Sequence, residues 1–458
     1  MHRRNGLGVV LLFAAVAACS RLPGRDRPSV VLITLDTLRA DHVGCYGHAR
    51  RITPHIDRFA REGVLFADAL VAIPETAPSI RSILTGLYPV HHDIRRNGYD
   101  PDPNRPTMQS LLGSAGYRTA AFTSSCVLDR ASGFGDGFDR FNDRTPDRFL
   151  LREHGQRTAE KTADAALGWL STRDEGPFFL WIHFIDPHSL YNPPPPYKSF
   201  FQERPCRGAL TGGADQFLDV IKHRLPIGPE ERKWLADRYD GEIAFLDHQI
   251  GRLLDGLENL APENTLVVLT ADHGESLGDH GYLFDHGDFL YEDQIRVPLL
   301  LSHPDLPRGL VVGGQVESVD ILPTVLDFVR LDLPKERDGA SLLPALRGDE
   351  APGRLALSES DGCDGGTMRP HRASGLTGKL FGVRDGRWKY VTDFSGWEEL
   401  YDLETDPGET TDLSRRESER GETMRRALRE RIGPSPWGGE EPLAPATREK
   451  LRALGYVD

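Results

Sequence analysis

Three aspartates stand at or near the ends of three apolar runs, where their side chains could bind a metal ion. Asp36 ends the run SVVLITLD, Asp272 follows TLVVLTA, and Asp186 lies in FFLWIHFIDPH. An aspartate is costly to bury without a partner, and a divalent cation is a natural partner for grouped carboxylates. For any one of them alone, a helix N-cap or a turn residue is the competing interpretation. The shared placement of all three favours a metal site.

A hydroxyl group at the start of a predicted helix is a second candidate for chemistry. In the stretch ETAPSIRSILTG, residues 75–86, apolar residues recur at helical spacing. Thr76 is expected to cap this helix, with Pro78 in its first turn. The free backbone N–H groups and the positive end of the helix dipole favour a phosphate or sulfate oxygen at that position. Thr76 is therefore expected either to meet an anionic substrate or to act only as a cap.

The elements that must position these residues are strands and crossover helices. Each of the three apolar runs predicts a strand that is buried on both faces. Helical patterns at residues 157–170 and 241–257 lie between them. This alternation predicts a largely parallel sheet, and ligands bind at the carboxyl ends of the strands in such sheets. The three aspartates would then lie along one rim.

A change of composition from about Ala356 predicts a second, smaller unit. The segments FGVRDGRWKYVT and EELYDLETDPGET have the pattern of short strands joined by tight turns, and a charged helix is expected from about Ser418 to Arg431. We therefore expect an α/β fold with a large domain at residues 29–350. A small domain at residues 351–458 would consist of an antiparallel sheet and a helix.

The N-terminus has the pattern of an export signal. The sequence MHRRNGLGVVLLFAAVAAC has a basic start, an apolar run too short for a convincing membrane span, and small residues before Cys19. It resembles a bacterial lipobox, so residues 1–18 are expected to be a lipoprotein signal peptide, Cys19 the lipidated residue and 19–28 a tether. Ser20 favours the outer membrane, facing the periplasm or the cell surface. A plain secretory signal is the alternative.

The charge and the cysteines limit the possible partners. A net charge of −14 argues against nucleic-acid binding, so an anionic substrate would need a metal ion or a few local cations to attract it.

Four cysteines remain beyond Cys19, enough for two disulfides in an oxidising compartment, but their spacing does not decide whether they pair. They are Cys45, Cys126, Cys206 and Cys363.

Six sequence blocks together resemble the sulfatase family, within the alkaline phosphatase superfamily. They occur in the order that the family has and cover nearly all of the expected mature chain. The resemblance implies a mixed central sheet, a small C-terminal domain and in-line hydrolysis of a sulfur or phosphorus ester beside a divalent metal ion. The blocks are LITLDTLRADHVGCYG, TAPSIRSILTGLYP, HFIDPHSLYNPPPPY, LTADHGESLGDHG, YEDQIRVPLL and ELYDLETDPGE.

The resemblance also assigns metal ligands. Asp36 corresponds to the first metal aspartate, and Asp272 with His273 matches the pair that completes the site. Thr37 stands where many sulfatases have a second aspartate. A histidine ligand with fewer carboxylates favours manganese or zinc over calcium. His273 could instead lie outside the ligand set, as a supporting or capping histidine.

Four further residues receive roles by the same resemblance. His188 and His286 match positions that contact the anionic group or protonate the leaving oxygen. Arg81 and Asp186 are assigned to substrate binding, although Arg81 is displaced by one position from the arginine of the family signature. Asp186, with His188 or His286, could instead hold a second metal ion.

The nucleophile position departs from the family pattern. Sulfatases carry a Cys or Ser that is oxidised to formylglycine where this chain has Thr76, and the signature arginine is replaced by Ile80. We therefore expect no formylglycine. A threonine oxygen is a competent nucleophile when a metal ion lowers its pKa, which suits phosphate esters better than sulfate esters. The alternatives are a phosphodiesterase or phospho-transferase acting on envelope lipids or glycans, and a relative that binds without turnover.

Overall fold

The computed structural model describes residues 27–92, 94–99, 101–143, 157–201, 210, 214–221, 225–348, 354–361 and 379–433. The expected signal peptide, the lipidation site Cys19, most of the tether, Cys206 and Cys363 lie outside these residues. Cys45 carries a free thiol. Within the described ranges, no helix combines the length and apolar character needed to cross a bilayer.

The large unit is built on an eight-stranded mixed sheet in the order β4-β3-β5-β1-β6-β7-β2-β8. Strand β7 runs antiparallel to both of its neighbours, and the other neighbouring pairs are parallel. The strands are β1 (Ser29–Leu35), β2 (Val64–Leu70), β3 (Arg118–Thr123), β4 (Arg140–Asn142), β5 (Phe178–Phe184), β6 (Thr265–Ala271), β7 (Arg296–Ser302) and β8 (Leu310–Glu317).

The three predicted apolar runs form the centre of this sheet. Strands β5, β1 and β6 are neighbours, and every residue in them is buried. The parallel register continues past the strand ends, since Asp36 N donates to Phe184 O at 2.9 Å and Asp272 N donates to Leu35 O at 3.2 Å. Two of the three aspartates therefore leave the sheet side by side at its carboxyl edge.

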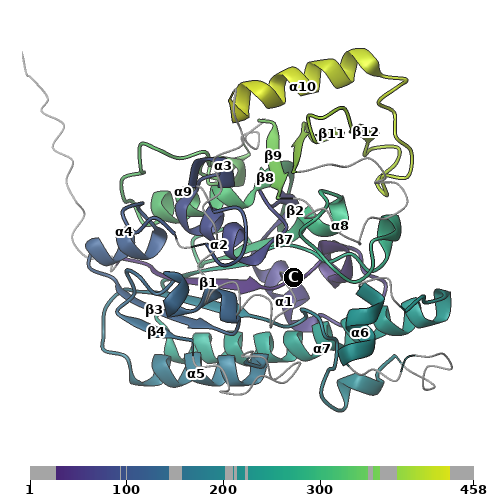
Figure 1. Cartoon of the computed structure of the whole chain (residues 1–458). Coiled ribbons are helices and arrows are strands. Elements are labelled where there is room, and N and C mark those ends of the chain that lie inside the picture. The colour runs from purple at the N-terminus through teal and green to yellow at the C-terminus, as the bar shows by residue number, and fades with distance from the viewer. Residues whose placement is uncertain are drawn as a thin grey trace, which may run out of the picture.

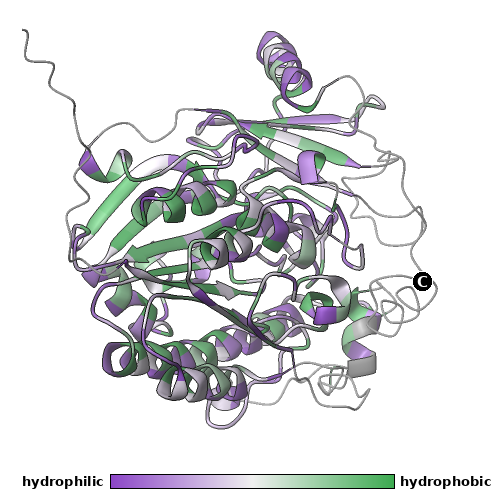
Figure 2. Cartoon of the chain, turned by 90° about the vertical axis from the view of Figure 1, so that its left-hand side faces the viewer, coloured by the Kyte–Doolittle hydropathy of each residue, from purple (hydrophilic) through white to green (hydrophobic). Residues whose placement is uncertain are grey.

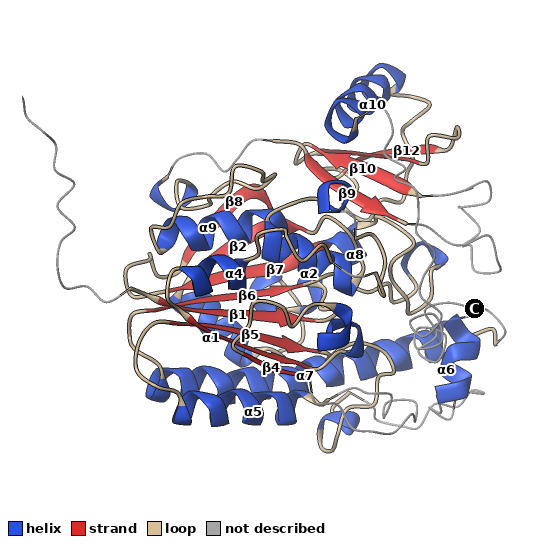
Figure 3. Cartoon of the chain, turned by 60° about the vertical axis from the view of Figure 1, so that its left-hand side comes forward, coloured by secondary structure: helices blue, strands red, loops and turns tan. Residues whose placement is uncertain are grey.

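Helices cover both faces of the sheet. Helices α5 and α7 run alongside each other at the bottom of Figures 1 and 3, and α2, α4 and α9 form a second group, in contact through α2, higher in both views. The helices are α1 (Pro54–Glu62), α2 (Thr76–Thr85), α3 (Pro89–His92), α4 (Met108–Ser114), α5 (Ala159–Thr172), α6 (Ala214–Ile221), α7 (Pro229–Leu260), α8 (Glu292–Ile295), α9 (Ile321–Phe328) and α10 (Ser418–Ile432).

Hydropathy follows this layering. The central strands in Figure 2 are coloured hydrophobic, whereas the outer helices carry both hydrophobic and hydrophilic residues. That contrast is typical of a sheet covered on both faces by helices with one side in water. Short 3₁₀ turns complete the connections: η1 (Ala40–His42), η2 (Gly44–Tyr46), η3 (Cys126–Leu128), η4 (Arg130–Ser132), η5 (Tyr197–Ser199), η6 (Asp279–Gly281), η7 (Ser318–Asp320) and η8 (Ala345–Arg347).

The smaller unit is a four-stranded antiparallel sheet with the helix α10 against it. Its order is β12-β11-β10-β9, from β9 (Ala356–Ser360), β10 (Leu380–Arg384), β11 (Trp388–Thr392) and β12 (Glu398–Asp402). Its core includes Phe381, Tyr390 and Leu428, and Tyr88 and Val319 of the large unit pack into it. The predicted fold class, a mostly parallel mixed sheet plus a small antiparallel sheet and helix, is confirmed.

Candidate active site

Two buried carboxylates form the base of the site. Asp36 follows β1 and Asp272 follows β6, and both are fully shielded from solvent. Both oxygens of Asp36 and Oδ2 of Asp272 have no hydrogen-bond partner among the described residues. Oδ1 of Asp272 accepts the backbone N–H groups of Thr37 at 3.2 Å and His273 at 2.8 Å. The three remaining oxygens are therefore available to a cation.

His273 completes a set of three donors. Its Nδ1 lies 2.9 Å from Gly274 O, and because a carbonyl only accepts, Nδ1 carries the proton. Its bare Nε2 lies 3.8 Å from Asp36 Oδ1 and 3.8 Å from Asp272 Oδ2. A lone pair held between two carboxylates is unfavourable unless a cation lies among them.

The chemistry of this donor set fits a divalent metal ion. The ligand atoms of Asp36, Asp272 and His273 all lie within 4.8 Å of one another. Burial raises the pKa of Asp36, and Asp272 adds to that rise, while burial raises the pKa of Asp272 to about 7. Burial also holds the pKa of His273 well below its usual value. A bound cation would offset the cost of burying both carboxylates, and one imidazole with two carboxylates suits zinc or manganese.

Thr76 lies next to this cluster. Its Oγ1 is 3.4 Å from His273 Nε2, and the residue is fully buried. The prediction that Thr76 caps α2 is wrong: Glu75, with an extended backbone, occupies the N-cap position and Thr76 is the first helical residue. The hydroxyl is therefore not used for capping and faces the group of potential ligands Asp36, Asp272 and His273, called the metal cluster below. Ser79 Oγ, one turn along, donates to Asp272 O and joins the helix start to the end of β6.

Thr37 is held in a strained conformation beside Asp36. Its φ of 57° is rare for a β-branched residue, and its Oγ1 is buried with no hydrogen-bond partner among the described residues. The phenol of Tyr239 donates to Thr37 O at 2.7 Å and accepts from Arg39 N at 3.0 Å. Such strain persists where the surroundings fix the backbone, and it is concentrated at functional sites.

Both histidines expected at the site are brought to it. The ring centroids of His286 and His273 lie 4.4 Å apart, and those of His188 and His286 lie 5.2 Å apart. His286 Nδ1 is 3.0 Å from Oε1 of Glu275, a buried residue that the sequence analysis did not single out. Burial opposes protonation of His286, but the charge and hydrogen bond of Glu275, together with other nearby carboxylates, outweigh it and raise the pKa of His286 to about 9. His286 therefore holds a proton at neutral pH.

Asn97 is a second residue that the sequence analysis missed. Its Oδ1 accepts from Ala77 N at 2.9 Å, and its backbone N–H donates to Glu75 Oε1 at 2.7 Å. The side chain is buried, and Nδ2 has no hydrogen-bond partner among the described residues. An unpaired amide donor at the start of α2 is suited to an oxygen of an anionic group. No motif identifies it, because only the tertiary fold brings Asn97 to Thr76.

His183 supports Asp36 from the neighbouring strand. Its Nε2 lies 3.3 Å from Asp36 Oδ2, and its Nδ1 lies 2.9 Å from Thr34 Oγ1. Thr34 Oγ1 also accepts the indole N–H of Trp181 at 3.0 Å, which leaves the hydroxyl proton for Nδ1 of His183. In that arrangement the imidazole proton lies on Nε2, so His183 offers no lone pair to a metal ion and its N–H attracts Asp36 Oδ2 across 3.3 Å without a hydrogen bond. Its alignment with Thr34 across two parallel strands is the signal that could have identified it.

Arg81 and Asp186 make their described contacts elsewhere. Arg81 Nη2 donates to Asp102 O at 2.8 Å, and burial, with Arg105 nearby, lowers the pKa of Arg81 to about 10. Asp186 Oδ2 accepts from Ala159 N at 2.8 Å, at the first residue of α5. Asp186 belongs to neither of the groups of potential metal ligands among the described residues. Its negative charge nevertheless contributes to the raised pKa of Asp36.

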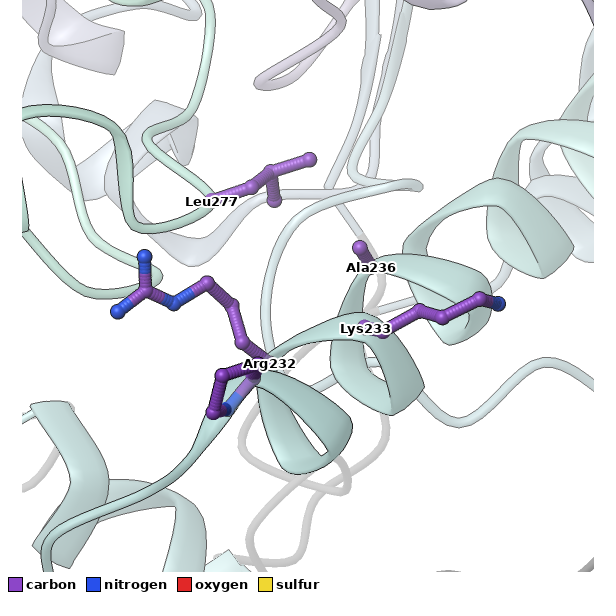
Figure 4. A pocket seen from close by; sticks show the side chains of 5 residues that line it. Arg232, Lys233, Ala236 and Leu277 are labelled. Carbon is purple, nitrogen blue, oxygen red and sulfur yellow. The ribbon is translucent and has the colours of Figure 1, made fainter.

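A pocket with a volume of about 340 Å³ lies at the start of α7, and Figure 4 shows the side chains around it. Leu277 lies across it from Ala236, and Arg232 Nη1 donates to Gly278 O at 3.2 Å. Pro229 and Lys233 complete the lining. None of these five residues belongs to the metal cluster.

Comparisons with known proteins extend over both sheets. A family model described as "Sulfatase" matches residues 28–331, and one described as "N-sulphoglucosamine sulphohydrolase, C-terminal" matches residues 278–434. The chain is 27% identical over 437 residues to the Delta 4,5-hexuronate-2-O-sulfatase of Bacteroides thetaiotaomicron, with 89% of this chain and 88% of that protein covered.

Two solved structures are similar. The phosphonate monoester hydrolase of Agrobacterium radiobacter aligns with a TM-score of 0.72 and 26% identity, covering 89% of this chain and 96% of that one. A structure determined in complex with its substrate D-glucosamine-2-N,6-O-disulfate aligns with a TM-score of 0.73 and 23% identity, covering 89% and 97%. Because the second structure is only 23% identical in sequence, its similarity supports the fold alone.

Proposed function

The chain belongs to the sulfatase family of ester hydrolases, and from that premise we propose that it is a metal-dependent hydrolase whose nucleophile is Thr76. The observation that carries the proposal is the distance of 3.4 Å between Thr76 Oγ1 and His273 Nε2. The hydroxyl is buried at the first residue of α2, beside three ligand atoms that suit a cation. The Thr76 hydroxyl, the three potential metal ligands and the N-terminus of α2 therefore lie next to one another.

The metal cluster and the helix start have complementary roles. Asp36, Asp272 and His273 would hold a divalent cation, which would lower the pKa of the nearby hydroxyl and stabilise negative charge in the transition state. Asn97 Nδ2, at the positive end of the α2 dipole, would bind an oxygen of the substrate's anionic group. Burial excludes water from these contacts, which strengthens each of them.

The reaction would proceed by two displacements. Thr76 Oγ1 would lose its proton to solvent and attack the central phosphorus or sulfur atom, the bond to the leaving alcohol breaks, and the alcohol oxygen takes a proton from a histidine. Water then attacks the same central atom and returns one proton to the histidine, and the bond to Thr76 Oγ1 breaks, which restores the threonine oxygen as it was before the attack. His286, which holds a proton at neutral pH beside Glu275, or its neighbour His188 supplies the first proton.

Threonine at this position favours a phosphoryl or phosphonyl ester. A phospho-threonine can be hydrolysed by attack at phosphorus, whereas a stable sulfo-threonine would trap the enzyme. The relative from Agrobacterium radiobacter, a phosphonate monoester hydrolase, supports this substrate class. A sulfate ester is the second candidate, because the Bacteroides relative is a hexuronate-2-O-sulfatase.

The proposal is tested with nitrophenyl sulfate, nitrophenyl phosphate, bis-nitrophenyl phosphate and a nitrophenyl phosphonate, each with added zinc, manganese or calcium. The wild type is compared with Thr76→Ala and with Thr85→Ala, a matched loss of a buried hydroxyl that donates to Arg81 O in the same helix. We expect phosphoryl or phosphonyl cleavage that disappears in Thr76→Ala and persists in Thr85→Ala. Cleavage that survives in Thr76→Ala would show that water, not Thr76, attacks.

The same assay separates the remaining alternatives. Transfer to an added alcohol in place of water would identify a phospho-transferase. A wild type that binds metal tightly but cleaves none of the four esters would favour a binding relative without turnover.

We also propose that the enzyme is exported and anchored at Cys19. The basic start, the short apolar run and the small residues before Cys19 support this placement in a bacterial envelope. Replacement of Cys19 by Ser should move the protein from the membrane fraction to the soluble fraction of cells. A protein that stays in the membrane fraction after this change would contradict the anchor.

A further inference from the structure

A second group of potential metal ligands lies outside the active site. His42 ends η1, His48 follows η2, and Asp240 lies in α7. One ligand atom from each of the three residues lies within 4.8 Å of the other two. Both histidines are largely shielded, with side chains about one-seventh exposed, and Asp240 is buried. The cluster therefore joins the segment after β1 to α7, the longest helix among the described residues.

One ring nitrogen of His48 faces a backbone carbonyl and the other faces a carboxylate. Its Nδ1 lies 3.1 Å from Asp41 O, and because that carbonyl only accepts, Nδ1 carries the proton. Nε2 of the neutral ring is then bare, is buried without a hydrogen-bond partner, and lies 3.5 Å from Asp240 Oδ2. A lone pair facing a carboxylate is repelled unless a positive charge lies between them. His273 has the same arrangement in the active site.

His42 supplies the third potential metal ligand, beside His48 and Asp240. Its Nδ1 lies 2.7 Å from Asp240 Oδ1, and its ring stacks on that of His48 with centroids 4.9 Å apart. The edge of Tyr239 packs against His42 with a centroid distance of 5.2 Å. These contacts fix both imidazoles before any ion arrives. Metal binding would only replace the proton on His42 Nδ1, so little reorganisation is required.

The groups behind Asp240 resemble the supporting shell of a metal site. Arg50 Nη1 lies 2.6 Å from Asp240 Oδ2, and Arg50 Nη2 lies 2.6 Å from Asp237 Oδ1. A carboxylate offers about four lone-pair positions, so Asp240 can keep Arg50 and still bind an ion through Oδ1. Ligating carboxylates are commonly held by such hydrogen bonds. Asp237 balances the charge of Arg50.

We propose that His42, His48 and Asp240 bind a zinc-class transition metal ion, separate from the ion of the active site. Two imidazoles and one carboxylate, with a water as fourth ligand, form a common tetrahedral zinc set. The ion connects the segment that carries Asp36 and Thr37 to α7. Tyr239, next to Asp240, hydrogen-bonds Thr37 O and Arg39 N, so this connection also fixes the backbone beside Asp36.

Metal counting tests the site on the full chain. After zinc loading and dialysis, we expect two zinc ions per chain in the wild type and one in His48→Gln. Asp272→Asn should also retain one, because it removes the other ion. His91→Gln, the loss of a histidine that is paired with Asp338 away from both groups, should retain two. A His48→Gln protein that binds as many zinc ions as the wild type would overturn the proposal, whereas an Asp272→Asn protein that binds as many as the wild type would count against the active-site ion alone.

Thermal melting provides a second readout that does not depend on activity. Zinc should raise the melting temperature of Asp272→Asn, because an ion bound only to the folded state stabilises it. The rise should disappear in the double variant Asp272→Asn/His48→Gln. If His48→Gln unfolds the protein in the absence of zinc, His42→Gln replaces it in the same comparison. No zinc-dependent rise in Asp272→Asn would overturn the proposal.

Discussion

Asp272 uses its two carboxylate oxygens for different purposes. Oδ1 accepts two backbone N–H groups and fixes the turn after β6, whereas Oδ2 is left bare beside His273 Nε2. One oxygen therefore serves the fold and the other is available for chemistry. Thr76 shows the same division, since Glu75 takes the N-cap position and leaves the threonine hydroxyl free for the metal cluster.

This division predicts the outcome of Asp272→Asn. The amide oxygen keeps both backbone hydrogen bonds, so the protein should fold, while the NH₂ group in place of Oδ2 cannot bind a metal ion. We expect loss of one metal ion per chain and a fall in kcat/KM of more than about 100-fold, since even partners outside the ligand set contribute 10- to 100-fold. Metal analysis and kinetics of the purified variant measure both effects.

Asp247→Asn is the matched control. Asp247 is also buried and lies outside the metal cluster. It accepts Ile56 N through Oδ1 and His55 N through Oδ2, so its amide variant loses one of these hydrogen bonds but no metal ligand. Its variant should keep the metal content and activity of the wild type. Full metal content in Asp272→Asn would contradict the ligand assignment.

The strands and helices explain which parts of the site could be predicted from sequence. Continuous apolar runs identified β1, β5 and β6, and the rule that ligands bind at carboxyl ends placed Asp36 and Asp272 correctly. Asn97, Glu275 and His183 were missed because their roles depend on contacts between elements, which no local pattern encodes. The predicted N-cap position of α2 was wrong by one residue. Glu75 occupies it, because its side chain accepts from Asn97 N and its backbone is extended.

A pH-dependent contact joins α3 to the segment beyond α9. His91 Nδ1 lies 2.8 Å from Asp338 Oδ2, and this hydrogen bond raises the pKa of His91 despite partial burial. A raised pKa in the folded state stabilises the protein below the unfolded pKa of about 6.5, and the effect is lost as the pH rises through the folded pKa. The pair is partly exposed, so its contribution should be a few tenths of a kcal/mol.

Urea unfolding of the wild type and His91→Gln tests this contact. We expect the variant to be slightly less stable than the wild type at pH 6, and the difference to shrink at pH 9. A difference that is the same at both pH values would contradict a charged His91–Asp338 pair and would indicate packing alone.

At the scale of the whole molecule, buried ion pairs attach the small sheet to the large one. Lys389 of β11 lies 2.7 Å from Glu409 Oε1 and 3.2 Å from Glu292 Oε1 of α8. Arg384 of β10 lies 2.8 Å from Asp68 Oδ1 of β2. Lys389 and Glu409 are almost fully shielded from solvent. Removing one partner of such a pair leaves a buried charge without compensation.

Lys389→Met should therefore lower the free energy of unfolding by about 3 kcal/mol. The double variant Lys389→Met/Glu409→Gln should recover part of the loss, because the uncompensated carboxylate is removed as well. Lys233→Met is the control, since Lys233 is largely exposed and its partner Asp237 keeps Arg50, so the change should cost less than about 1 kcal/mol. Equal losses for the two lysine variants, measured by urea unfolding, would contradict the role of Lys389 in joining the sheets.

The nucleophilic role of Thr76 is the central claim, and a covalent adduct tests it most directly. The protein would be mixed with the best nitrophenyl ester, quenched in acid within the first turnover, digested and examined by mass spectrometry. We predict that Thr76 carries the phosphoryl, phosphonyl or sulfuryl group of the substrate, and that Thr85 of the same helix does not. An enzyme that turns over with no adduct on Thr76 at any quench time, and whose Thr76→Ala variant remains active, would contradict the account.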